Sequence, residues 1–295
     1  MTDPYASADA YDAATPEIAL RRERTFGQVI SDTLSVLGAH LGVFLPALFV
    51  VVALPLIGVL VVGVLAGPVA GAVLAGLASI PLFYVLMAAG YAYMLLYEEG
   101  FFVRGETLSA GALWAATKPL FVPVLSVQIA AGVVAALPIL AIVALAAALE
   151  SWGLGAALGA VWFCAVVYFS PGFSMATPVA IIEGEGPFSA IKRGVELVKG
   201  FWWQTFGVTV VASILSAVFA IPLSIAAGVA GVALDGPVGD GLNALLTSVG
   251  YVSYVVLIGA TLLQYFNLVE RKEGRQLDAR IEEIGMEDDD EEPLF

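Results

Sequence analysis

Few residues of this chain have the types and spacing that enzyme chemistry requires. The 295 residues include one histidine, His40, and one cysteine, Cys164. Zinc sites take three or four Cys, His or carboxylate ligands, so these two residues cannot build a common zinc site, and one cysteine cannot form a disulfide within the chain. The sequence also lacks a glycine-rich phosphate-binding loop with its lysine. We therefore expect no enzyme activity, no cofactor and no metal centre.

Charged residues next to the apolar segments could instead bind a protein partner. Six positions are candidates for such a cytoplasmic interaction surface: Glu183, Glu185, Lys192, Arg193, Arg271 and Glu273. Exposed charges usually form a solvated face that contributes little binding energy. A partner site and a solvated face are both compatible with the sequence.

Three prolines recur in matching apolar surroundings. They are Pro55, Pro138 and Pro222, which are 83 and 84 residues apart. A proline inside a membrane helix removes one backbone hydrogen bond and usually kinks the helix. Three kinks at one depth could surround a cavity or a gate. The alternative is that proline is simply frequent in membrane helices.

The composition is that of an integral membrane protein. Hydrophobic residues make up 60% of the chain, charged residues 13%, and the mean hydropathy is +0.94. Soluble domains have roughly 45–50% apolar and about 25% charged residues. Every backbone amide must be satisfied within the structure inside a bilayer, so long apolar runs predict helices. The first apolar run is longer than a signal-peptide core, which indicates an uncleaved membrane anchor.

The gaps between charged residues predict six membrane-spanning helices. Residues 33–97 contain no charge and are long enough for two crossings, with a break at Gly67-Pro68. The other four charge-free runs are 119–149, 151–182, 200–234 and 241–269. The predicted fold class is therefore an all-α polytopic membrane protein.

The positive charges predict the orientation of these spans. All twelve Lys and Arg residues fall on one side of the six predicted crossings. The loops on the other side hold only Glu150, Asp235 and Asp240 as charged residues. By the positive-inside rule, both termini lie in the cytoplasm.

The spacing of the motifs predicts three repeats of one unit. Each unit is an amphipathic cytoplasmic helix followed by a membrane hairpin, and the three units span about residues 25–100, 105–186 and 187–274. The amphipathic stretches lie near 26–37, 108–118 and 188–198, and alanine and glycine weaken the apolar face of the second.

The ends of the chain complete the predicted organisation. Residues 1–24 form a disordered N-terminus, 25–275 the membrane domain, and 276–295 a short amphipathic stretch with an acidic tail. The net charge is −14, and 11 of the 26 acidic residues follow Val269. This charge argues against nucleic acid and against anionic lipid headgroups as partners.

Short motifs along the chain resemble a known bacterial membrane family. They occupy residues 179–184, 190–193, 197–202, 265–266 and 271–274, with the sequences VAIIEG, AIKR, LVKGFW, YF and RKEG. They resemble the membrane domain attached to some glycerophosphoryl diester phosphodiesterases, and its stand-alone relatives. The resemblance implies a membrane architecture over roughly residues 25–280 and carries over no functional residue. One departure is Gly194, where the family pattern has a serine after the Lys-Arg pair.

The predicted spans contain no Asp, Glu, Lys or Arg, and this observation determines which functions the sequence favours. Ion-coupled and proton-coupled carriers place ionisable residues near the bilayer midplane, but here only His40 lies at the edge of a span. A non-catalytic scaffold or accessory subunit of the bacterial cytoplasmic (inner) membrane is the leading hypothesis. The alternatives are a transporter or lipid-handling protein for a neutral or amphiphilic substrate, and an intramembrane enzyme. Expected partners are membrane lipid and a protein that contacts the cytoplasmic segments.

Overall fold

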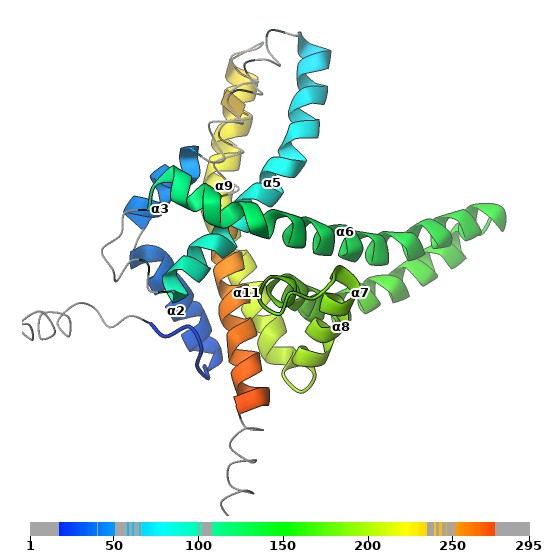
Figure 1. The fold of residues 1–295 in the computed structure, drawn as a ribbon. Helices are drawn as coiled ribbons and strands as arrows, with labels where there is room; N and C mark the ends of the chain where they lie inside the picture. Colours follow the sequence, from blue (N-terminus) through cyan, green and yellow to red (C-terminus); the bar gives the residue numbers. More distant parts are fainter. Residues whose placement is uncertain are drawn as a thin grey trace, which may run out of the picture.

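The computed structural model describes an all-helical chain. The described residues are 18–39, 41–50, 67–99, 101, 108–234 and 252–274, with scattered positions from 58 to 65 and from 239 to 250. The helices are α2 (Phe26–Ala39), α3 (Leu41–Leu48), α5 (Pro68–Glu98), α6 (Ala110–Ala148), α7 (Trp152–Ile182), α8 (Pro187–Val198), α9 (Trp202–Ala233) and α11 (Tyr254–Val269), followed by the π-helical turn η2 (Glu270–Gly274) (Figure 1). The all-α class is therefore confirmed for the described part of the chain.

Four helices are long and apolar enough to cross a membrane. They are Ile80–Glu98 within α5, the whole of α6 and of α7, and Trp202–Val229 within α9. A fifth candidate is α2 together with residues 42–48 of α3, although this pair is bent by 75°. The structure thus supports a membrane-embedded protein with four or five crossing helices in its described residues.

The predicted break between the first two spans coincides with the start of α5. Gly67 caps this helix with a φ of 93°, a left-handed conformation that glycine adopts without steric cost. Pro68 occupies the first turn, where its missing amide proton has no helical partner to lose. The Gly67-Pro68 pair therefore marks the start of α5.

Two of the three predicted amphipathic helices exist as separate elements. Helices α2 and α8 fall where the sequence places them, and α8 buries Ala190, Leu197 and Val198 on one face. The second prediction is wrong, because residues 108–118 lead straight into the 39-residue helix α6. The stretch buries Leu108, Leu113 and Thr117, but its several alanines favour continuation of the helix, so it does not end before the membrane segment.

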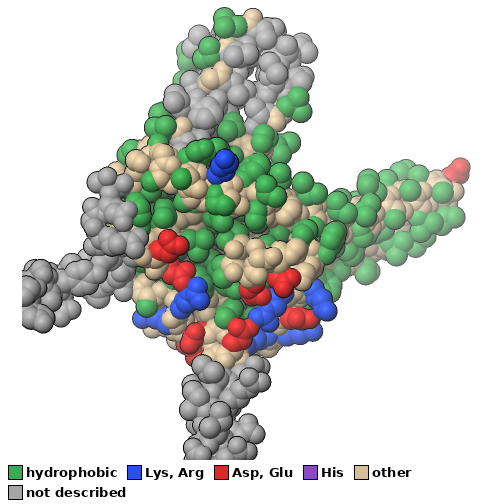
Figure 2. Space-filling view, viewed as in Figure 1, with side chains coloured by type: hydrophobic (Ala, Val, Ile, Leu, Met, Phe, Trp, Pro, Cys, Tyr) green, Lys and Arg blue, Asp and Glu red, His purple; other side chains and the backbone are tan. Residues whose placement is uncertain are grey.

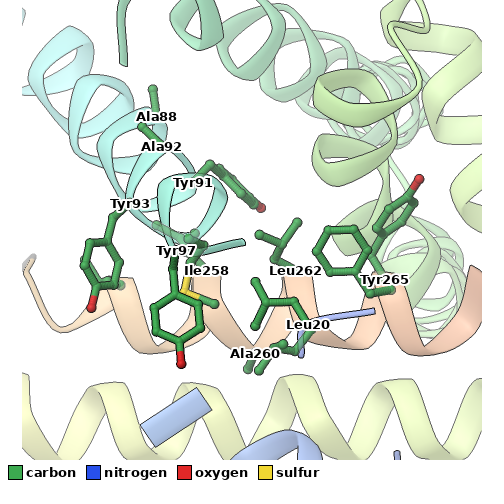
Figure 3. Close-up of a cluster of buried hydrophobic side chains, with 14 of the residues drawn as sticks. Leu20, Ala88, Tyr91, Ala92, Tyr93, Tyr97, Ile258, Ala260, Leu262 and Tyr265 are labelled. Atoms are coloured by element: carbon green, nitrogen blue, oxygen red, sulfur yellow. The ribbon is translucent and has the colours of Figure 1, made fainter. Parts of the chain in front are cut away.

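The helices converge on one core at the base of the molecule. The C-terminal parts of α5 and α7 meet α11, α2, α8 and the first turns of α9 there. Tyrosines of α5 lie against aliphatic side chains of α11 (Figure 3). The Tyr93 hydroxyl donates to the Val36 carbonyl oxygen at 2.9 Å, which ties α5 to α2.

Two apolar arms leave this core in different directions. Helices α5 and α9 rise together, whereas the α6–α7 hairpin extends sideways (Figure 1). Hydrophobic side chains cover the described surface of the hairpin, and most of the charged side chains gather at the base (Figure 2). Leu140 and Phe163 on the hairpin are 63% and 68% exposed. At about 1.5 Å per residue α6 is about 58 Å long, nearly twice the roughly 30 Å of a hydrocarbon core, so it can both cross a bilayer and join the base.

Candidate functional site

Three of the six predicted interaction residues form one ion cluster. Arg193 of α8 lies between Glu183, at the end of α7, and Glu273 of η2. Its Nε is 3.1 Å from Glu183 Oε2, and the Tyr265 hydroxyl donates to Glu183 Oε1 at 2.9 Å. Burial lowers the pKa of Arg193, but the bonds to Glu273 and Glu183 outweigh this effect and raise it overall. The cluster therefore joins α7, α8 and the end of α11 to one another.

The other three predicted residues lie apart from this cluster. Glu185 accepts a hydrogen bond from the Ser189 hydroxyl at 2.6 Å, within the first turn of α8. Lys192 is exposed on α8. Arg271 of η2 belongs to a second polar centre, in which it bonds to Asn267 and to the backbone of Arg24. The six positions thus do not form a single ion cluster.

The second polar centre surrounds Arg24, which is only 1% exposed to solvent. Its Nε donates to Asp32 Oδ2 of α2 at 2.8 Å. Its terminal nitrogens donate to the carbonyl oxygens of Leu20, at 2.5 Å, and of Ala19 and Arg22. The guanidinium group therefore folds residues 19–24 into a tight strap and fastens this strap to α2.

The backbone of Arg24 fastens the same strap to the end of the membrane domain. Its amide donates to Asn267 Oδ1 of α11 at 2.7 Å. Its carbonyl oxygen accepts from Arg271 Nη2 at 2.5 Å and from Gln204 Nε2 of α9 at 3.4 Å. One residue thus links the strap, α2, α9, α11 and η2.

Neutral polar side chains continue this centre between α9 and α11. Asn267 Nδ2 donates to Gln264 Oε1 at 3.1 Å, and Gln264 Nε2 donates to Thr205 Oγ1 at 3.0 Å. All three side chains are buried. Hydrogen bonds between buried polar side chains hold membrane helices together, because each unpaired group would remain desolvated.

Electrostatics make the Arg24–Asp32 pair the most costly part of the centre to disturb. Burial raises the pKa of Asp32, but hydrogen bonds from Arg22 and Arg24 outweigh it, so the pKa lies below its ordinary value. Burial lowers the pKa of Arg24, and the bond to Asp32 opposes this effect. Removing one partner of a buried pair leaves an uncompensated charge and costs about 3–5 kcal/mol.

The polar centre joins several segments through hydrogen bonds and an ion pair. Its donors and acceptors are used by one another, as the distances above show. Among the described residues, no group of three or more His, Cys, Asp or Glu side chains could hold a metal ion. The arrangement can fix five segments at the charged end of the membrane domain.

The structure places the predicted prolines on different arms. Pro138 is half-buried within α6, and Pro222 is exposed within α9. Pro55 lies outside the described residues. Near Pro138, the indole nitrogen of Trp162 in α7 donates to the Ala135 carbonyl oxygen at 3.1 Å. This bond ties α7 to α6 one residue after Val134, whose carbonyl oxygen loses its helical donor to Pro138.

Sequence reasoning missed the Arg24 centre because it treated Arg24 only as a positive charge. One signal was present, since Gln264 and Asn267 are amides within the last apolar run, and such residues usually face a neighbouring helix. The glycine at position 194 was a signal for a different feature, the close contact between α7 and α8. A Cβ added there would lie 2.4 Å from the Gly172 carbonyl oxygen of α7, so the serine of the family pattern has no room here.

Comparisons with known proteins leave the family of the chain open. Neither protein-family models, curated proteins nor solved structures give a match to this chain. The resemblance to the phosphodiesterase-associated membrane domain therefore stays a prediction based on the motifs.

Proposed function

We propose that this chain is a non-catalytic scaffold or accessory subunit of the bacterial inner membrane. The observation that carries the proposal is the mutual pairing of the polar groups around Arg24 at the charged base. Arg24, Asp32, Gln264 and Asn267 bond to one another or to the backbone. Catalysis and ion transport both need polar groups that remain available to a substrate, whereas a scaffold needs a rigid base and exposed apolar helices.

The proposed arrangement is six crossings as three hairpins, with both termini in the cytoplasm. The charged base supports this orientation, since described Lys and Arg side chains gather there (Figure 2), and such residues favour the cytoplasmic side. Single cysteines in a Cys164→Ser background test it. Glu150→Cys, at the turn between α6 and α7, should react with a membrane-impermeant maleimide added to intact cells. Lys192→Cys should react only after lysis, and its labelling in intact cells would reverse the orientation.

The scaffold function is tested by the composition of the complex in native membranes. A tagged full-length chain, extracted in a mild detergent, should carry a partner at constant stoichiometry. Replacing exposed apolar residues of the α6–α7 arm, such as Val161 and Phe163, with alanine should release the partner without changing thermal unfolding. The matched control is Val210→Ala on α9, which is also exposed but lies on the other arm.

One result would overturn the scaffold proposal directly. The purified chain, reconstituted alone into liposomes, should not move neutral or amphiphilic solutes across the bilayer. A monodisperse chain without partner that carries out such transport would favour the transporter or lipid-handling function instead. The measurement is release or flipping of a fluorescent solute or lipid compared with empty liposomes.

A further inference from the structure

Cations gather where α8 ends and α9 begins. Lys199 follows the last residue of α8 and is exposed. The Lys272 amine donates to the Glu196 carbonyl oxygen at 2.6 Å, which places it at the last turn of the same helix. Burial lowers the pKa of Lys272, and the charges of Arg193 and Lys199 lower it further, against the opposing effect of Glu196. Lys199 and Lys272 therefore both lie at the C-terminal end of α8.

Aromatic rings continue from these lysines into the first turn of α9. Trp202 stacks on Tyr168 of α7 with 5.9 Å between ring centroids, and its indole nitrogen donates to the Tyr168 carbonyl oxygen at 2.7 Å. Trp203 packs edge-on against Trp202 at 4.6 Å and is 79% exposed. Tryptophan concentrates at membrane–water interfaces, where its ring is buried among acyl chains and its N–H meets the headgroups.

We infer that the α8–α9 corner, defined as Lys199, Trp202, Trp203 and Lys272, binds the headgroup of an anionic phospholipid of the cytoplasmic leaflet. Its lysines complement a phosphate that bears an uncompensated negative charge, and its exposed indole provides an apolar neighbour for the acyl chains. The corner lies at the charged base, where Lys and Arg side chains stand over α8 beside the apolar α6–α7 arm (Figure 2).

Acidic residues near the corner pair with another cation and leave Lys199 exposed. Arg193 is already paired with Glu183 and Glu273. The acidic net charge of the whole chain, −14, argues against anionic lipid, but 11 of its 26 acids follow Val269 and so belong to the end of the sequence. Local density of cations decides lipid contact, since charge attraction decays within about 8–10 Å at physiological salt.

The test compares quenching of tryptophan fluorescence by two brominated lipids. The full-length chain is reconstituted into vesicles of phosphatidylcholine that contain either brominated phosphatidylglycerol or brominated phosphatidylcholine. At the site where tryptophan is quenched, the wild type should bind phosphatidylglycerol more tightly than phosphatidylcholine. The expected preference is about fivefold for each contributing lysine. Lys199→Glu should abolish this preference, and 0.5 M salt should weaken it. Trp203→Phe should remove a large part of the selective quenching itself.

The matched control is Lys118→Glu, which makes the same change of charge at an exposed lysine on α6. It should leave the preference intact, whereas equal effects of the two variants would show a general surface attraction and overturn the proposal. Equal quenching by both lipids in the wild type would also overturn it. A preference that emerges only after deletion of residues 285–295 would identify the acidic tail as the occupant and would likewise contradict the lipid site.

Discussion

The base of the molecule and the α6–α7 arm differ in what surrounds their side chains. At the base, Arg24, Tyr93 and Leu262 are fully enclosed by several elements. On the arm, none of the residues in the most apolar stretch of α7 is buried, and the buried residues of this helix all lie in its last twelve positions. The base therefore depends on long-range contacts, whereas the arm depends on one helix pair and its turn.

The contrast shows which part of the molecule specifies how the helices are arranged. Lipid tails are as apolar as leucine, so apolar side chains alone do not favour one arrangement of membrane helices over another. The base adds directional bonds, such as those of Arg24 and Asn267, that only one arrangement satisfies. The arm offers a surface that lipid or a partner helix can cover. Substitutions at the base should consequently lower the free energy of unfolding much more than substitutions on the arm.

Arg24→Ala should have the largest effect of any single substitution considered. It leaves Asp32 without its buried partner and removes the strap's bonds to its own carbonyl oxygens, which should cost about 3–5 kcal/mol. Arg22→Ala is the matched control, because its side chain also bonds to Asp32 but is about half exposed. Thermal unfolding of the detergent-solubilised protein measures both. Similar losses of stability for the two variants would show that burial of the arginine does not determine how much it stabilises the base.

Gly194→Ser should destabilise the base by about 1–3 kcal/mol or more. The new Cβ would meet the backbone of α7 at Gly172, which can yield only if the two helices separate. The control on the arm is Gly159→Ala, where an added Cβ meets nothing within 4 Å. That substitution should be neutral or stabilising by up to about 1 kcal/mol, because alanine favours helix. A stable Gly194→Ser variant would contradict the close contact of α7 and α8.

Acid should loosen the base through Asp32. The pKa of this carboxyl is depressed in the folded chain, so its contribution is complete above the ordinary Asp pKa of about 3.9 and is lost as the pH falls through the folded value. Unfolding temperatures measured between pH 7 and pH 3 should therefore fall in the acid range. Asp32→Asn should be less stable at neutral pH and should show a shallower decline on acidification. A decline as steep as that of the wild type would assign the acid sensitivity to other groups.

The smallest effect is expected at the turn of the arm. Glu150 has a φ of 48°, and the amides of Glu150 and Ser151 bond back to the carbonyl oxygens of Ala147 and Ala146. This is a helix ending in which glycine usually occupies the left-handed position. Glu150→Gly should stabilise the arm by about 1 kcal/mol or less. Hydrogen exchange of the α6 and α7 amides should slow at the turn, with no change in α11; faster exchange would show that Glu150 makes a favourable contact.

Local patterns predicted many of the helices of this fold. Charge-free runs predicted the positions of α6, α7 and α9, and the Gly67-Pro68 pair predicted the start of α5. Amphipathic spacing predicted α2 and α8 but failed at residues 108–118, where a separate short helix and a continuous long one have the same local pattern. The six crossings and the three repeats stay predictions, because residues 51–57 and most of 235–251 lie outside the described part.

The amino-acid sequence alone predicted that the chain is helical, that it is embedded in a membrane and that its charged residues lie outside the long apolar runs. These properties follow from composition and spacing along the chain. Only the tertiary structure decided which polar residues meet, because Arg24 is separated from Asn267 by 243 residues, and Arg193 from Glu273 by 80. It also decided that three of the six predicted charges form one ion cluster, whereas Arg271 bonds to Asn267 and to the backbone of Arg24. Hydrogen bonds act over about 3 Å, and no periodicity in the sequence specifies such a distance between remote segments.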